Sequence, residues 1–286
     1  MITSIAEDRM MVISDVHLGN RLFRSRRPFI EFLKYACAND YNLCINGDGV
    51  DISQTSLTRI ARDLSDCAVQ LRKFSQKGLK VYYVVGNHDI VMEYFLDDWE
   101  LVHIVPFLNV TSGDKRIRIE HGHLFDESFV ETPFLYMAAT LIGGFALRIH
   151  PKLYEGFERT RPMCEKIRCF FLPGAYQNGD EKGNTESIPN EPVAYRNAAA
   201  EISRHGFDYI ILGHTHCAGE VGVGSAARYM NTGSWLFHPH YVEIDQGQVE
   251  LKRVVDLPAT LADNSSAPTI LLSSRHKRSR PSGVRI

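Results

Sequence analysis

The chain has 286 residues and a formal net charge of −2, with 32 Lys and Arg against 34 Asp and Glu. Its length can bury a full core in one large domain or two small ones, and its composition is that of an ordinary globular protein. The small net charge excludes a strong electrostatic attraction to nucleic acid.

Short apolar runs alternate with helical patterns up to about residue 213, which predicts an α/β fold. We expect strands at 9–14, 42–46, 80–85, 102–105, 116–120 and 208–213. We expect helices just after Pro28, over about 57–77 and over about 192–204.

The pattern beyond residue 213 changes to strands and turns, including a hairpin around Gln246 and Gly247. We expect a second, all-β portion there, packed on the first sheet. Residues 1–258 would form one domain, with a helical insertion at about 124–190 that is rich in aromatic residues and Arg. The basic tail, 259–286, has a composition typical of disorder.

The six cysteines contain no C-x-x-C pair, so we expect reduced thiols in a cytoplasmic protein. The N-terminus lacks the pattern of a signal peptide. The apolar run at 133–147 is about five residues too short to span a bilayer.

Polar clusters follow the ends of the expected strands. Because ligands bind at the carboxyl ends of strands in open α/β sheets, we expect these clusters to converge at one sheet edge. They comprise Asp15 and His17; Asp48; Asn87, His88 and Asp89; His121 and His123; and His214 and His216.

Each cluster has an ordinary explanation when taken alone, as turn chemistry or a satisfied surface histidine. Seven of these residues together offer two Asp, one Asn and four His, a set that matches two divalent cations sharing a carboxylate. Asp15 and His17 are two residues apart, so on an extended segment both side chains would point to one face. His214 and His216 have the same spacing.

The motifs "DVHLG", "GDGVD", "GNHD", "HGH" and "GHTH" occur in this order between residue 11 and about residue 250. This set resembles the calcineurin-like metallophosphoesterases. The resemblance implies a four-layer double β-sandwich flanked by helices, with a dimetal centre at the strand ends. It assigns Asp15, His17, Asp48 and His216 to one metal, and Asp48, Asn87, His121 and His214 to the other.

The resemblance also implies that a metal-bridging hydroxide attacks phosphorus, with Asp48 bridging the metals and His88 contacting the phosphoryl group or protonating the leaving oxygen. Asp51 and Asp89 are expected to support the site without binding metal. Asp89 could orient His88 or cap the segment that follows it. His123 stands where the family usually has another residue, and it could donate to substrate.

Two features bear on the substrate. Arg21, Arg24, Arg26 and Arg27 follow the first motif and could bind extra phosphates, or could form a solvated basic loop. Residues 124–172 combine aromatic and basic side chains, which suits a lid over an acyl chain or contact with the inner membrane face, or else an ordinary packed helical hairpin.

Both features, and "YMNTGSW" at 229–235, resemble the branch that contains UDP-2,3-diacylglucosamine hydrolases. Those enzymes carry Arg where this chain has His88, so the resemblance does not fix the substrate. We expect two divalent ions, Mn first, with Fe or Zn as alternatives. The oligomeric state stays open.

Two other functions compete with a small-molecule or lipid-linked phosphoester hydrolase. A nuclease or cyclic-nucleotide phosphodiesterase of the same superfamily would share the metals, but the acidic body disfavours a nuclease. A non-catalytic scaffold would have lost ligands, and none of the seven is missing. The sequence also lacks the Arg and the "GNHE" of Ser/Thr protein phosphatases.

Overall fold

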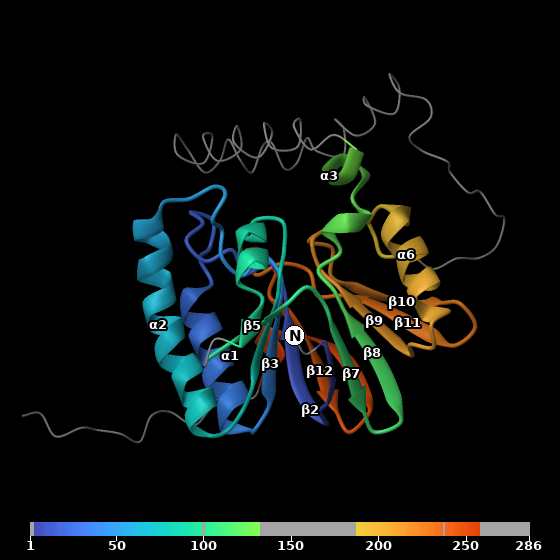
Figure 1. The fold of residues 1–286 in the computed structure, drawn as a ribbon, viewed down its shortest axis with the longest axis horizontal. Helices are drawn as coiled ribbons and strands as arrows, with labels where there is room; N and C mark the ends of the chain where they lie inside the picture. The colour runs from blue at the N-terminus through green and yellow to red at the C-terminus, as the bar shows by residue number, and fades with distance from the viewer. Residues whose placement is uncertain (1–2, 99–100, 132–186, 237, 258–286) are drawn as a thin grey trace, which may run out of the picture.

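The computed structural model describes residues 3–98, 101–131, 187–236 and 238–257. Two β-sheets lie face to face, with α1 and α2 outside one sheet and α6 outside the other (Figure 1). The helices are α1 (Arg26–Ala38), α2 (Leu57–Gln76), α3 (Glu127–Glu131) and α6 (Val193–Ser203), with short 3₁₀ turns η1 (Ile90–Phe95), η2 (His123–Phe125) and η3 (Val254–Asp256).

The seven-stranded sheet has the order β13-β12-β2-β3-β4-β6-β5, with β2, β3, β4 and β6 parallel to one another. Its central strands read as continuous apolar runs because both faces are covered; every residue of β3 is buried. Its strands are β2 (Arg9–Ile13), β3 (Asn42–Asn46), β4 (Val81–Val84), β5 (Asp97–Asp98), β6 (His103–Val105), β12 (His240–Asp245) and β13 (Gln248–Arg253).

The six-stranded sheet has the order β1-β7-β8-β9-β11-β10 and mixes parallel with antiparallel pairs. Its strands are β1 (Ser4–Ala6), β7 (Leu108–Ser112), β8 (Lys115–Ile119), β9 (Tyr209–Leu212), β10 (Gly219–Val223) and β11 (Ala227–Asn231). The described chain beyond residue 213 is all-β, as expected, but it forms no sheet of its own: β10 and β11 join β1, β7, β8 and β9, while β12 and β13 extend the first sheet. Sequence order could not reveal this because each sheet takes strands from both halves of the chain.

Alternation along β2 separates two hydrophobic cores. Met11 and Ile13 face the helices, whereas Met10 and Val12 face the other sheet. A third core lies between the six-stranded sheet and α6. The order helix, sheet, sheet, helix confirms the expected four-layer architecture.

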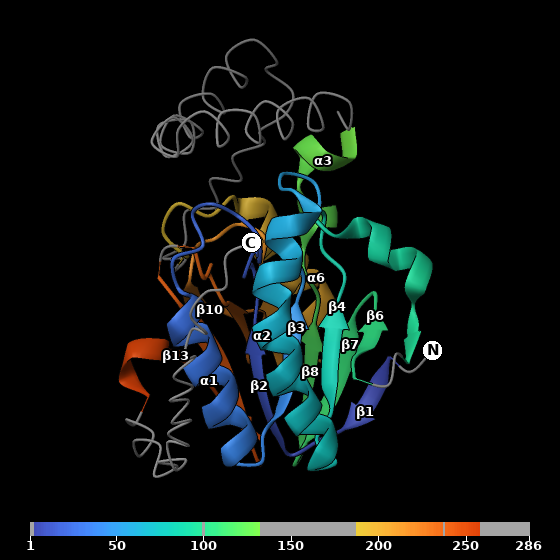
Figure 2. The same ribbon diagram turned by 90° about the vertical axis from the view of Figure 1, so that its left-hand side faces the viewer.

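The helices on the first sheet follow from their apolar spacing. Ile60, Cys67 and Phe74 of α2 are seven residues apart and all buried, so they form one stripe against the sheet. Helices α1 and α2 lie side by side over that sheet (Figure 2). Helix α1 begins at Arg26, two residues before Pro28; Pro is tolerated there because N–H groups of the first turn have no intrahelical acceptor.

Most of the expected insertion, at 132–186, and the tail from 259 onward lie outside the described residues. The possible lid, membrane contact or packed hairpin at 124–172 thus lies largely outside them too. Among the helices of the described part, none is long and apolar enough to cross a membrane.

Candidate metal centre

The predicted ligands meet at one end of the sheets, in loops that follow β2, β3, β4, β8 and β9. The first three strands belong to the seven-stranded sheet and the last two to the six-stranded sheet. Our expectation of a single sheet edge is therefore wrong. The site is built where the carboxyl ends of two facing sheets approach each other, so ligands reach it from both sides.

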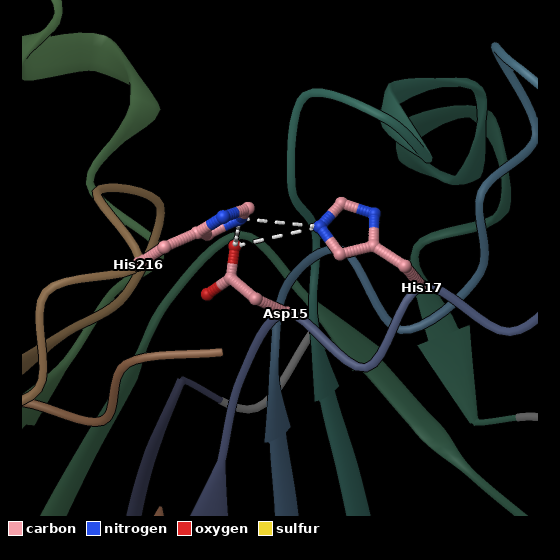
Figure 3. Close-up of side chains that lie close together, drawn as sticks. All are labelled: Asp15, His17 and His216. Atoms are coloured by element: carbon pink, nitrogen blue, oxygen red, sulfur yellow. Dashed lines mark hydrogen bonds and ion pairs between the residues drawn. The ribbon is translucent and has the colours of Figure 1, made fainter. Parts of the chain in front are cut away.

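One cluster joins the loop after β2 to the loop after β9. His216 Nε2 lies 3.1 Å from Asp15 Oδ1 and 3.3 Å from His17 Nε2. Figure 3 shows the three side chains pointing toward one another. Asp15 is fully buried. These three ligand atoms lie within 4.8 Å of one another, close enough to share a cation.

A second cluster lies next to the first. His121 Nε2 is 3.4 Å from Asp48 Oδ2 and 3.3 Å from Asn87 Oδ1. Asp48, His121 and His214 also offer ligand atoms within 4.8 Å of one another. Asp48 Oδ2 is in addition 4.0 Å from His17 Nε2 of the first cluster, so this one oxygen lies between the two groups.

The backbone delivers these side chains through left-handed turns. Asp15, His17, Asp48, His214 and His216 all have φ between 51° and 67°, a region that non-glycine residues seldom adopt. The expected extended segments are therefore wrong. Asp15 and His17 still meet, with His17 Nε2 3.9 Å from Asp15 Oδ1, whereas His214 and His216 go to different clusters. Backbone hydrogen bonds hold the strained turns: Trp235 N donates to Asp15 O at 3.1 Å and His17 N to Asp48 O at 2.8 Å.

Two glycines permit the close approach of these loops. A Cβ on Gly86 would lie 2.2 Å from Asp48 Oδ1, and one on Gly47 would lie 2.3 Å from the His121 ring. Any side chain at either position would push a ligand residue out of place. Packing thus requires the glycines of "GD" and "GNHD", and the left-handed backbone of Gly47, with φ of 77°, favours glycine there as well.

The electrostatics leave several ligand atoms unprotonated. Burial lowers the pKa of His17 to about 4, with a contribution from His88, and burial also lowers the pKa of His214. Burial opposes ionisation of Asp48, but His121 and His88 outweigh it and lower its pKa. In return the carboxylates outweigh the effect of burial on His121 and raise its pKa to about 9. A cation would compete for that proton.

His88 follows β4 and forms a third group with His17 and Asp48, whose ligand atoms also lie within 4.8 Å of one another. Its Nε2 lies 4.0 Å from Asp48 Oδ2, and its ring meets the His17 ring edge-on at 4.8 Å. On the other side of the ring, Nδ1 is 3.0 Å from Asp51 Oδ1 and 2.9 Å from Ser53 Oγ. Burial alone would lower the pKa of His88, but Asp48 and Asp51 outweigh it and raise the pKa to about 10.

A sequence profile described as calcineurin-like phosphoesterase matches residues 9–218. The chain belongs to the calcineurin-like phosphoesterase family. The family expected from the five motifs is thereby confirmed, and the paired His and Asp clusters are what a dimetal phosphoesterase requires.

The chain is also similar over nearly its whole length to proteins named UDP-2,3-diacylglucosamine hydrolase. The protein from Edwardsiella ictaluri is 22% identical over 271 residues, 92% of this chain and 98% of that protein. The one from Psychromonas ingrahamii is 24% identical over 256 residues, 85% of this chain and 96% of that protein. A dimetal phosphatase structure from Danio rerio matches with a TM-score of 0.44 and 13% identity, covering 86% of this chain and 95% of that one.

Asp89 takes neither of the two positions expected for it in this phosphoesterase. Its Oδ1 accepts a hydrogen bond from Gly86 N at 2.7 Å, and its Oδ2 accepts one from the Tyr83 hydroxyl. No side-chain hydrogen bond from Asp89 caps η1. Asp51, not Asp89, contacts the His88 ring. Asp89 instead holds the "GNHD" turn through its bond from Gly86 N.

Among the four arginines after the first motif, Arg26 is held by helix α2. Arg26 pairs with Asp63 at 3.3 Å and with Asp66 at 2.7 Å, both on α2. Arg26 therefore links α1 to α2, and its expected contact with substrate is not what the structure shows. Arg27 is exposed in the first turn of α1, and Arg21 and Arg24 are exposed in the segment before it.

His123 lies next to the second cluster. It is buried, neither ring nitrogen has a hydrogen-bond partner, and its ring is 5.6 Å from that of His121. Burial, followed by the charges of His121 and His214, lowers the pKa of His123 to about 3. The side chain is thus a neutral imidazole beside the candidate ligands.

Sequence reasoning missed the residues that hold the ligand loops. Ser234 Oγ donates to Asp15 O at 3.2 Å, and Asn231 Nδ2 donates to Gly213 O at 2.9 Å. "YMNTGSW" thus ties the loop after β2 to the loop after β9. The density of short polar residues directly after an apolar strand was the available signal. Asp126 and Glu191, also missed, contact the loop after β9.

Proposed function

We propose that this phosphoesterase hydrolyses a phosphoester or pyrophosphate bond with two divalent cations. Asp15, His17 and His216 would hold one cation, and Asn87, His121 and His214 the other, with Asp48 shared between them. The observation that carries the proposal is the position of Asp48 Oδ2, which lies 4.0 Å from His17 Nε2 and 3.4 Å from His121 Nε2.

The residues fit such a pair of ions in chemistry and in burial. Imidazole nitrogens and carboxylate oxygens suit Mn, Fe or Zn. His17 Nδ1 is buried without a hydrogen-bond partner, and the fully buried carboxylate of Asp15 is costly unless a positive charge faces it. Mn²⁺ is the first choice for an assay because this donor set accepts it and carries no thiolate.

Bound cations would supply Lewis acidity toward a water nucleophile and toward the phosphoryl oxygens. The protein itself would supply the proton. His88 Nε2 is the ring nitrogen on the Asp48 side, while Nδ1 is held by Asp51 and Ser53. A protonated His88 can therefore hydrogen-bond a phosphoryl oxygen and donate its Nε2 proton to the departing oxygen.

The substrate we propose is a lipid-linked or nucleotide-containing pyrophosphate, such as UDP-2,3-diacylglucosamine. The support is similarity to hydrolases of that name over 85–92% of this chain. One residue argues against assigning their substrate to this chain directly. This chain has His88 where its resemblance to those hydrolases leads us to expect Arg. The exposed Arg24 and Arg27 remain candidates for binding additional phosphates.

The first test is hydrolysis of an activated aryl phosphodiester by the purified protein with Mn²⁺. We expect turnover that EDTA removes and that Mn²⁺ restores. Asp48→Ala should reduce the rate to background because it removes the shared ligand. Full activity in EDTA, or full activity of Asp48→Ala, would overturn the dimetal mechanism.

A substrate panel under the same conditions then separates the candidate activities. It would contain UDP-2,3-diacylglucosamine, a dinucleoside polyphosphate, a cyclic nucleotide and single-stranded DNA. We expect the highest kcat/KM for the first. A preference for the cyclic nucleotide or for DNA would replace this substrate class with a phosphodiesterase or nuclease activity, while leaving the cation site intact.

A further inference from the structure

One turn supplies ligands to both clusters. Residues Gly213 to Cys217 follow β9, and within them His214 belongs to the second cluster and His216 to the first. Both histidines have left-handed backbones, with φ of 67° and 61°. A strained backbone of this kind persists only where surrounding contacts stabilise it, so those contacts determine how well both sites are formed.

Asp126 contacts the first of these histidines. Its Oδ2 lies 3.2 Å from His214 Nε2, and both side chains are largely buried, with 4% and 14% exposed for His214 and Asp126 respectively. A carboxylate accepts here, so Nε2 carries the proton and Nδ1 is left with its lone pair. This hydrogen bond sets which nitrogen of His214 can bind a cation.

His121 of the same cluster has the reverse arrangement. Its Nδ1 lies 2.8 Å from the carbonyl oxygen of Asn46, so Nδ1 donates and Nε2 is free to face Asp48. Each histidine of the second cluster therefore has one nitrogen fixed by an oxygen acceptor. This pairing of a histidine ligand with an oxygen acceptor is the usual way in which proteins orient imidazole ligands toward a metal.

Glu191 holds the middle of the turn. Its Oε1 accepts hydrogen bonds from Thr215 Oγ1 at 2.9 Å, from the Tyr229 hydroxyl at 2.6 Å and from Asn231 Nδ2 at 2.9 Å. Thr215 lies between the two histidines, and Asn231 also donates to Gly213 O at 2.9 Å. One carboxylate oxygen thus gathers three donors around the turn.

We propose that Asp126 and Glu191 are positioning residues of the cation site. Asp126 orients His214 for the second cation, and Glu191 fixes the Gly213–Cys217 turn for both cations. This inference rests on the proposed function, because it presumes that the two clusters bind cations. Neither carboxylate touches substrate in this proposal, so both act through His214 and His216.

The test measures cation affinity rather than activity. Isothermal titration of Mn²⁺ into chelator-treated protein would give the affinity of each site. The background His17→Ala disables the first site and isolates the second, whereas Asn87→Ala isolates the first. The absorption spectrum of bound Co²⁺ reports the ligand geometry in each background.

We expect Asp126→Ala to weaken the second site by about 10–100-fold and to leave the first site unchanged. Glu191→Ala should weaken both sites. Glu191→Gln should restore most of the affinity, because the amide oxygen can still accept the three hydrogen bonds. Changes in the Co²⁺ spectrum should accompany each loss of affinity.

Glu7 provides the matched control. It is a half-buried carboxylate in the loop between β1 and β2 that accepts a hydrogen bond from Asn42 Nδ2 at 2.8 Å, and burial raises its pKa as it does that of Glu191. Glu7→Ala should leave both cation affinities unchanged. Circular dichroism of the chelated proteins would verify that every variant is folded.

The outcomes separate the two proposals. If the unaltered protein binds no Mn²⁺, the proposed dimetal function fails. If it binds two ions and Asp126→Ala leaves the second site unchanged, the role of Asp126 is overturned. If Glu191→Gln loses as much affinity as Glu191→Ala, or if Glu7→Ala loses affinity too, the role of Glu191 as a specific acceptor is overturned.

Discussion

His88 is placed by two carboxylates, and each has a different consequence for its chemistry. Asp51 Oδ1 lies 3.0 Å from Nδ1 and fixes the ring. Asp51 is itself fully buried and is held by Asn20 Nδ2 at 2.6 Å. Asp48 lies on the Nε2 side at 4.0 Å. The two negative charges keep His88 protonated, which is the state that a general acid requires.

Asp51→Asn tests this arrangement, with His88→Ala as the reference. Removing the Asp51 charge lowers the pKa of His88, so the alkaline loss of activity should begin at lower pH. His88→Ala should lower kcat by about 10²–10⁴-fold while the protein still binds two Mn²⁺ ions. An unchanged pH–rate profile in Asp51→Asn would contradict the effect of Asp51 on the pKa of His88. Loss of a bound cation in His88→Ala would show that His88 is a ligand.

Sequence patterns could identify the ligand candidates because metal chemistry restricts residue type. They could not identify Asp126 or Glu191, since each contacts its partner across more than 20 residues of chain. The same limit applies to Arg26, which the sequence places near the site but which pairs with α2. Partners that are close only in space leave no local pattern.

At the scale of elements, periodicity located the six strands and three helices for which we expected ranges, but it gave no range for β1, β5 or β7. Strand β3 coincides with its expected range, and α2 ends one residue early. The partition of strands between sheets could not be predicted, because burial on both faces gives the same apolar run in either sheet. The left-handed turns were missed because Asp and His, although enriched in this region, adopt it in only a small minority of cases.

Trp235 joins the candidate site to an element far from it in sequence. Its side chain is fully buried between Phe29 and Phe32 of α1, with ring centroids 5.0 and 5.2 Å away. Its backbone nitrogen donates to Asp15 O. The packing of α1 on the sheet and the placement of a candidate ligand therefore share one residue.

We expect Trp235→Ala to lower the free energy of unfolding by about 3–5 kcal/mol, measured by urea denaturation. Trp235→Phe should lower the free energy of unfolding clearly less, because it keeps an aromatic ring and because Trp235 Nε1 has no hydrogen-bond partner to lose. Equal losses in the two variants would contradict the importance of the ring contacts with α1.

At the scale of the whole molecule, the stability should depend on pH through buried carboxylates near the site. Burial raises the pKa of Glu191 to about 7, against hydrogen bonds from Tyr229, Thr215 and Asn231 that lower it. Burial followed by the charge of Asp48 raises the pKa of Asp89 to about 6. Both groups bind a proton more tightly in the folded chain than in the unfolded chain.

Glu191→Gln isolates one of these contributions, with the protein kept in chelator so that cation binding does not interfere. Because the folded pKa of Glu191 is raised, its contribution to stability is fully present below about pH 4.5 and is lost as the pH rises through about 7. The Gln side chain does not ionise, so the variant does not lose this stability as the pH rises. Urea denaturation should therefore give similar stabilities near pH 5 and a variant more stable than the unaltered protein at pH 8, by on the order of 2 kcal/mol. Parallel stability curves for the two proteins across this range would mean that Glu191 ionises as it does in the unfolded chain, and that its three donors compensate fully for its burial.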